Sequence, residues 1–142
     1  MNDDIQAIKN LIFAYAEAFD LGDFDAAVGL FRDASVQVAG ADVELRGEEA
    51  RLLLTGMVQT YEGIPRTKHL TTNVVVEIED GDAVARSYFV AIQAVDGFPL
   101  QPIISGRWHD TFKKVDGRWR FDTRVIHADL IGDISRHLTG GQ

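Results

Sequence analysis

The spacing of apolar residues changes once along this chain, from a helical period near the start to an extended period after residue 67. In residues 3–20 the apolar positions recur at the spacing of an amphipathic helix; they are Ile5, Ile8, Leu11, Ile12, Ala16 and Phe19. Asp23 can cap a second, short helix that runs to Phe31. A third helix is expected from Glu48 to about Tyr61, with its buried face formed by Leu52, Leu53, Met57 and Val58.

The extended part of the chain predicts an antiparallel meander. Its long strands are expected at 68–79, 83–95, 103–115 and 118–128, after two short strands at 35–38 and 43–45. Asp80-Gly81 and Asp116-Gly117 are typical of tight hairpins. Residues 96–102 contain two prolines and are expected to form a mobile loop beside a pocket, and residues 139–142 are expected to fray.

Helices followed by a meander indicate a segregated α+β fold. We expect one domain over residues 1–142, in which a curved antiparallel or mixed sheet wraps around the three N-terminal helices. Such a sheet leaves a cone-shaped cavity where a small ligand would bind.

Both faces of the predicted sheet carry apolar residues. In the strand 83–95, Val84, Tyr88, Val90 and Ile92 alternate with Ala83, Ala85, Phe89 and Ala91. In the strand before it, Leu70, Val74 and Val76 are expected on one face and His69 on the other. If the outer face were solvated, apolar and polar residues would alternate more regularly along each strand. The pattern therefore predicts a homo-oligomer, either a dimer or a trimer, whose partner covers the outer face.

Composition limits the possible partners. The 142 residues are 46% hydrophobic and 25% charged, as in a soluble globular protein, and the net charge of −8 disfavours nucleic acid and anionic membranes. The absence of cysteine excludes disulfides and thiolate catalysis. No apolar run is long enough to span a bilayer and the acidic N-terminus does not resemble a signal peptide, so a cytoplasmic location is expected. No metal-ligand spacing or phosphate-binding glycine loop is present, and we expect neither metal nor cofactor.

Asp20 and His69 are the candidate catalytic pair. Asp20 falls near the edge of the apolar stripe at the end of the first helix, where a carboxylate opposes the helix dipole. Local misfits of this kind are enriched at functional sites. A histidine with one nitrogen held by a buried carboxylate is a general base at neutral pH. The alternative is a strand histidine bonded to a backbone carbonyl and a solvated acid at the helix end.

Three further residues have two interpretations each. Arg124 could stabilise developing negative charge if it faces the cavity, or form an ion pair with Asp122 or Glu77. Tyr15 could donate a hydrogen bond to a substrate oxygen, or be part of the core. Trp108 is expected to be pocket wall rather than a reactive group. His109 and His127 are expected on the opposite strand face from Trp108 and Arg124, outside the pocket. His137 lies in the tail.

Several motifs, in this order along nearly the whole chain, resemble the SnoaL-like branch of the nuclear-transport-factor superfamily. They are Tyr15-Ala16, Asp20-Leu21-Gly22-Asp23, Phe31-Arg32-Asp33-Ala34, His69 with Asn73, Arg86-Ser87-Tyr88, Gly106-Arg107-Trp108-His109-Asp110 and Asp116-Gly117-Arg118-Trp119-Arg120. The resemblance implies a curved-sheet cone with a deep pocket, the cystatin-like α+β barrel.

Within that branch the His–Asp arrangement is similar to scytalone dehydratase and hexachlorocyclohexane dehydrochlorinase. The resemblance implies that Asp20 orients His69 as the base and that Arg124 assists. It also implies a substrate-binding wall formed by Trp108, Val90, Ile92, Ile104, Gly106 and Tyr88. The second pocket histidine of scytalone dehydratase has no counterpart in Ala91-Ile92-Gln93-Ala94, and the carboxylate base of ketosteroid isomerase has none in Val36-Gln37-Val38.

The leading hypothesis is a cofactor-independent lyase, a dehydratase or related elimination enzyme, acting on a small, mostly apolar, cyclic substrate. His69 would remove the proton, Asp20 would fix its tautomer, and Arg124 and Tyr15 would help the leaving group or an oxyanion. The alternatives are an isomerase or polyketide-type cyclase with the same base, and a non-catalytic small-molecule binding protein or structural subunit.

Overall fold

A computed structural model of the protein describes residues 2–139. The helices are α1 (Asn2–Asp20), α2 (Phe24–Gly29), the 3-10 helix η1 (Gly47–Ala50) and α3 (Arg51–Leu54). The strands are β1 (Ser35–Val38), β2 (Glu44–Arg46), β3 (Thr67–Glu79), β4 (Asp82–Val95), β5 (Phe98–Val115) and β6 (Arg118–Ile131). The expected fraying at the C-terminus falls mainly on residues 140–142, which lie outside the described residues.

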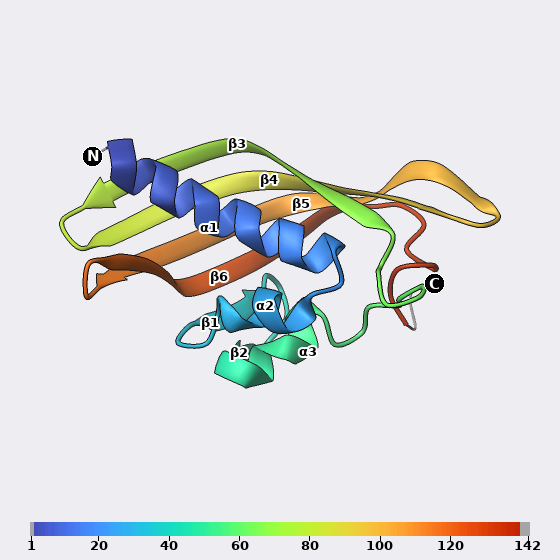
Figure 1. Ribbon diagram of the computed structural model, residues 1–142, viewed down its shortest axis with the longest axis horizontal. Coiled ribbons are helices and arrows are strands. Elements are labelled where there is room, and N and C mark those ends of the chain that lie inside the picture. The colour runs from blue at the N-terminus through green and yellow to red at the C-terminus, as the bar shows by residue number, and fades with distance from the viewer. Residues whose placement is uncertain (1, 140–142) are drawn as a thin grey trace.

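The strands form one six-stranded mixed sheet in the order β2-β1-β6-β5-β4-β3. Neighbouring strands are antiparallel except β1 and β6, which run parallel. Figure 1 shows α1 lying along one face of the sheet, with α2, α3 and the short strands gathered below it. The predicted α+β class, with N-terminal helices on a mixed sheet, is confirmed.

Aspartate–glycine pairs turn the chain three times, once more than the sequence predicts. Asp80 and Asp116 adopt the left-handed φ values of 57° and 54° in the two predicted hairpins. The expected mobile loop at 96–102 is wrong, because Asp96 and Gly97 form a third tight turn that pairs Val95 with Phe98. The two prolines are unusual in a strand, and residues 98–102 were therefore not predicted as one. In the structure, β5 contains Pro102 next to a shift in its register with β4.

The third helix is shorter than predicted. It ends at Leu54, where the N–H groups of Thr55 and Gly56 both bond to the carbonyl of Arg51. Ala50 and Leu54 are buried, whereas Leu52 is 60% and Met57 is 48% exposed. The expected buried face is therefore wrong for Leu52 and Met57, whereas Leu53 and Val58 are partly buried against the core. The chain after residue 56 turns to meet the C-terminal segment through a Val58–Leu138 bridge.

A β-bulge reverses the alternation of faces within β3. Asn73 has a φ of 53°, and the register with β4 shifts between Thr72 and Val75. His69 consequently points to the same face as the half-buried Val74 and Val76, while Leu70 lies on the outer face and is 49% exposed. The predicted assignment of these residues to the two faces of β3 is wrong, because it assumed that side chains alternate without interruption along the strand.

The inner face of the sheet packs against α1. Ile8, Ile12 and Phe19 of the helix are at most 3% exposed, and they join one core cluster with Phe89, Trp108, Phe112 and Phe121 of the sheet. Tyr15 of the same helix is buried with them. This packing brings the end of α1 against the beginning of β3 (Figure 1).

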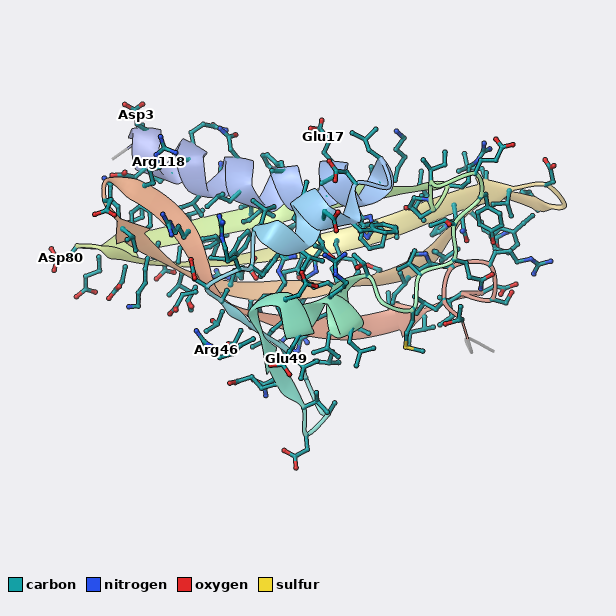
Figure 2. The ribbon with its side chains drawn as sticks, turned by 60° about the horizontal axis from the view of Figure 1, so that its bottom comes forward. Asp3, Glu17, Arg46, Glu49, Asp80 and Arg118 are labelled. Carbon is teal, nitrogen blue, oxygen red and sulfur yellow. The ribbon has the colours of Figure 1, made fainter. Side chains whose placement is uncertain are left out.

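Most charged side chains lie on the outside of these layers. Figure 2 shows Asp3 and Glu17 on the outer side of α1 and Asp80 at the tip of the β3–β4 hairpin. In the part of the chain that the structure describes, no helix combines the length and the apolar character that crossing a membrane would require.

Candidate active site

His69 and Asp20 form a buried pair where the end of α1 meets the start of β3. The ring Nδ1 of His69 lies 2.7 Å from Oδ1 of Asp20, and the two side chains are 7% and 9% exposed. The carboxylate also accepts the backbone N–H of His69 at 2.7 Å and the hydroxyl of Thr67 at 2.8 Å. Because an ionised carboxylate only accepts, the proton of the neutral ring is on Nδ1, and the lone pair of Nε2 is available as a base.

The chain places Asp20 by ending α1 at a defined residue. The N–H of Gly22 bonds to the carbonyl of Phe19 and the N–H of Asp23 to that of Ala18, which is a Schellman motif. Gly22 has a φ of 80°, and a Cβ there would lie 2.2 Å from the carbonyl oxygen of Gly63. Glycine is therefore required for both conformation and space. Asp23 then caps α2 through the N–H of Ala26, as predicted.

Aromatic rings surround the imidazole of His69. The ring of Phe19 lies 4.7 Å away in an edge arrangement, and the ring of Trp108 lies 6.3 Å away and almost parallel. Phe89 stacks on Trp108 at 4.9 Å. The surroundings of the dyad are thus largely apolar, the environment in which hydrogen bonds to a charged intermediate are strengthened.

A hollow between α1 and β3 reaches the dyad from outside. Its volume is about 340 Å³, within the range of small-molecule sites. It is lined by Phe13, Ala16, Glu17, Asp20 and Leu21 on the helix side and by Lys68, His69 and Thr71 of β3. The centre of the predicted cone, in contrast, is filled by the buried rings of Tyr15, Phe31 and Trp108.

Arg124 contacts Trp108, and its hydrogen bonds go to Asp110 rather than to Asp20 or His69. Its side chain and that of Asp110 are both fully buried and form two parallel hydrogen bonds of 2.8 and 3.0 Å. The guanidinium carbon is 4.0 Å from the centre of the Trp108 ring. The ion pair that the sequence allowed therefore exists, but with Asp110 rather than with Asp122 or Glu77. Burial raises the pKa of Asp110, and the Arg124 charge opposes this shift.

Tyr15 belongs to the same aromatic layer. Its ring meets those of Trp108 and Phe31 edge-on at 5.7 and 5.6 Å. Burial raises the pKa of Tyr15 to about 12, so the phenol keeps its proton at neutral pH. The core interpretation of this residue accounts for its packing.

The predicted wall residues divide between the two faces of the sheet. Trp108 and Gly106 are buried on the inner face, and a Cβ on Gly106 would lie 2.9 Å from the Phe89 ring. Ile104 is half-buried against the same core. Tyr88, Val90 and Ile92 alternate with the inward Phe89 and Ala91, and Tyr88 is 50% exposed on the outer face. Those three residues therefore do not line the space beside His69.

His137 is buried next to the dyad, which sequence reasoning missed. It is 5% exposed, and its ring centre lies 5.9 Å from that of Phe19, the ring that also contacts His69. Burial, with a smaller contribution from the charge of His69, lowers the pKa of His137 to about 4. Its position in a polar C-terminal tail gave no signal of this location.

Comparison with known proteins agrees with the fold. A protein from Novosphingobium aromaticivorans, described as NTF2-like with a cystatin-like fold, is 25% identical, with 89% of this chain and 82% of that chain covered and a TM-score of 0.74. A proposed scytalone dehydratase from the same organism is 24% identical over 92% and 89% of the two chains, with a TM-score of 0.71. LinA is 20% identical over 93% of each chain, also at 0.71.

No curated protein matches the sequence significantly. The family model described as a SnoaL-like domain matches residues 2–125, which include α1, all of β3 to β5 and both members of the dyad. The chain therefore belongs to the SnoaL-like domain family of the NTF2-like superfamily.

Proposed function

We propose that the protein is a lyase that needs no cofactor and eliminates water or acid from a small, mostly apolar, cyclic substrate. The observation that carries the proposal is the 2.7 Å contact between His69 Nδ1 and Asp20 Oδ1 inside an apolar enclosure. This contact leaves Nε2 of His69 as a base and gives the imidazolium a buried counter-charge once it forms.

The reaction begins when Nε2 of His69 takes a proton from a carbon next to an activating group. The C–H electron pair forms the new double bond while the leaving group departs with its own pair. Asp20 fixes the ring and stabilises its charge, because it already accepts three hydrogen bonds. The hollow between α1 and β3 admits the substrate.

Arg124 and Tyr15 act as positioning residues in this proposal. Arg124 is held by Asp110 and stacks on Trp108, so it supports the wall of the site from behind. Tyr15 packs edge-on against the same indole. Neither residue is among those that line the hollow.

The test is a screen of hydroxylated and halogenated cyclic compounds for elimination, with wild type, His69→Ala and Asp20→Asn compared on any substrate found. We expect each substitution to lower kcat by about 10²- to 10⁴-fold while the fold and ligand binding are kept. His109→Ala is the control, because this histidine lies exposed on the outer face.

The products separate the proposal from its alternatives. An isomerase or cyclase using the same base would return all atoms of the substrate in one product. A binding protein would bind without turnover and be indifferent to Asp20→Asn. Normal turnover in either dyad variant would refute the base role of His69.

A further inference from the structure

A second stripe of residues on α1 faces the hollow beside the dyad. Its later members follow the first at three, four and seven residues, which places them on one face of the helix; they are Phe13, Ala16, Glu17 and Asp20. The stripe that the same helix contributes to the core is a different one, formed by Ile8, Ile12, Tyr15 and Phe19. Helix α1 therefore has one face for the core and another for the hollow, and the second face ends at the acid of the dyad.

Phe13 is a large apolar residue that stays exposed in this stripe. It is 41% exposed, and it lines the same hollow as His69. Ala16 has the smallest side chain among the lining residues, so space is left on this face of the helix between Phe13 and the dyad. Covering an exposed aromatic ring with an apolar group is favourable, because it removes apolar surface from water. The hollow therefore offers a binding place for an apolar group beyond the one that meets His69.

The distance along the helix sets the size of the ligand. Phe13 and Asp20 are seven residues apart, which corresponds to about 10 Å along the helix axis. A compound of two fused rings extends further along this face than a single ring held at His69. Its second ring then lies over Ala16 and meets the exposed ring of Phe13.

We propose that Phe13 is a further substrate-binding residue of the dyad site and that it contacts the second ring of a fused two-ring substrate. This inference rests on the proposed function, because it concerns the substrate of the same base. It narrows the substrate from small cyclic compounds to compounds with two fused, mostly apolar rings. Aromatic pairs in edge or offset contact contribute favourable free energy beyond the apolar area that they bury, so an aromatic second ring suits Phe13 best.

The charged residues of the lining favour a small compound over another protein chain as the ligand. Glu17 and Lys68 are both exposed, and they line the hollow from α1 and from β3 respectively. A chain seated on the hollow would remove water from both charges, at a cost in free energy. A small compound that lies along Ala16 and Phe13 leaves both charges hydrated.

The experiment compares cyclohexanol with 2-tetralol, in which a benzene ring is fused to the same hydroxyl-bearing ring. Affinities for both probes are measured at pH 7.5 by following the imidazole NMR signals of His69. We expect wild type to bind 2-tetralol about tenfold more tightly than cyclohexanol. Phe13→Ala should weaken 2-tetralol binding about three- to tenfold and cyclohexanol binding less than about twofold. Phe13→Tyr keeps the ring and should retain most of the 2-tetralol affinity.

Leu100→Ala is the matched control, since this leucine is 68% exposed on β5 and is not among the residues that line the hollow. An equal loss for both probes in Phe13→Ala would mean that the substitution alters the whole site, and it would overturn the inference. So would a wild type that binds 2-tetralol no better than cyclohexanol, or a Phe13→Ala variant with unchanged 2-tetralol affinity.

Light scattering of Phe13→Ala tests the other possible occupant of the hollow. A fall in mass relative to wild type would assign the exposed ring to a contact between copies of the chain and would also overturn the inference. The proposed function fails in a different way, through normal turnover in His69→Ala or Asp20→Asn. That result would leave the affinities of the Phe13 variants unchanged, so the two failures are distinguishable.

Discussion

The carboxylate of Asp20 holds His69 twice, accepting its ring Nδ1 at 2.7 Å and its backbone N–H at 2.7 Å. One residue at the end of α1 thus fixes both the position of β3 and the orientation of the imidazole. The same carboxylate accepts the hydroxyl of Thr67. Since all three partners donate, the site is built for an ionised acid rather than for an amide.

The tautomer of His69 follows from this arrangement. At a pH where the ring is neutral, ¹⁵N spectra should show a protonated Nδ1 and a bare Nε2. Asp20→Asn should redistribute the proton or disorder the ring, because the new amide N–H₂ meets at least one group that also donates. Thr67→Val is the control, since it removes one hydrogen bond from Asp20 and leaves those to His69. A neutral wild-type ring protonated at Nε2 would contradict the proposed base.

Two ion pairs of similar length should differ sharply in their contribution to stability. Asp110→Asn leaves the fully buried Arg124 without its counter-charge, and we expect a loss of about 3–5 kcal/mol in the free energy of unfolding. Asp129→Asn breaks the Arg107 pair, whose side chains are 39% exposed, and should lower the free energy of unfolding far less, because solvent screens this pair. Urea denaturation measures both; equal effects would mean that burial of the pair does not decide its contribution.

Alanine substitutions at Gly22 and Gly40 give a second matched comparison of stability. Both have positive φ, 80° and 84°, so replacement by alanine should cost about 1 kcal/mol at each from backbone strain alone. Only at Gly22 does the added Cβ lie 2.2 Å from a backbone oxygen; none is within 4 Å at Gly40. Gly22→Ala should therefore lose clearly more stability in urea denaturation and also shift the ring signals of His69. Similar losses in both variants would show that the loop at Gly63 moves aside.

The dyad could be predicted from sequence because it depends on two local features, the end of an amphipathic helix and the start of a strand. The faces of β3 could not, since the bulge at Asn73 has no unique signal in the alternation of apolar residues. The partner of Arg124 was missed for a similar reason. Counting back from the Val115–Arg118 pair puts Asp110 opposite Thr123, and only the register shift after Thr111 moves it to Arg124.

His137 was missed because its position depends on contacts far apart in sequence. The hydrogen bonds that hold the C-terminal segment around His137 come from Gln59 and Gln93, and nothing in the local sequence of either residue indicates this role. Buried polar groups that bind backbone carbonyls across long separations leave no periodic pattern. Local chemistry was thus predictable, whereas the surroundings of the dyad required the tertiary structure.

We also propose that the outer face of the sheet is covered by a second copy of the chain. Val84, Tyr88 and Leu70 are 54%, 50% and 49% exposed on neighbouring strands, and a contact with another chain would bury these large apolar side chains. Tyr88→Lys should shift the mass measured by light scattering toward that of a 15.7 kDa monomer. Leu52→Lys is the control, since this 60% exposed leucine lies on α3, away from that face. A wild-type monomer would refute the proposal.

His137 should make the fold sensitive to mild acid. Burial lowers its pKa to about 4, below its ordinary value of 6.5, so between those values the unfolded chain binds the proton more readily than the folded one. The contribution of the neutral His137 ring to the free energy of unfolding is complete above about pH 6.5. It is lost progressively as the pH falls toward 4, by about 3 kcal/mol in total. The charge of Asp20 opposes this shift and that of His69 adds to it.

The measurement is urea denaturation of wild type and His137→Gln from pH 7.5 to 4. Carboxylates that pair in the folded state also weaken the protein over this range, but they contribute equally to both chains. The difference in unfolding free energy between the two should therefore shrink as the pH falls, because only wild type has to protonate the imidazole on unfolding. A difference independent of pH would mean that His137 titrates normally in the folded protein and is open to water, which would remove it from the buried surroundings of His69.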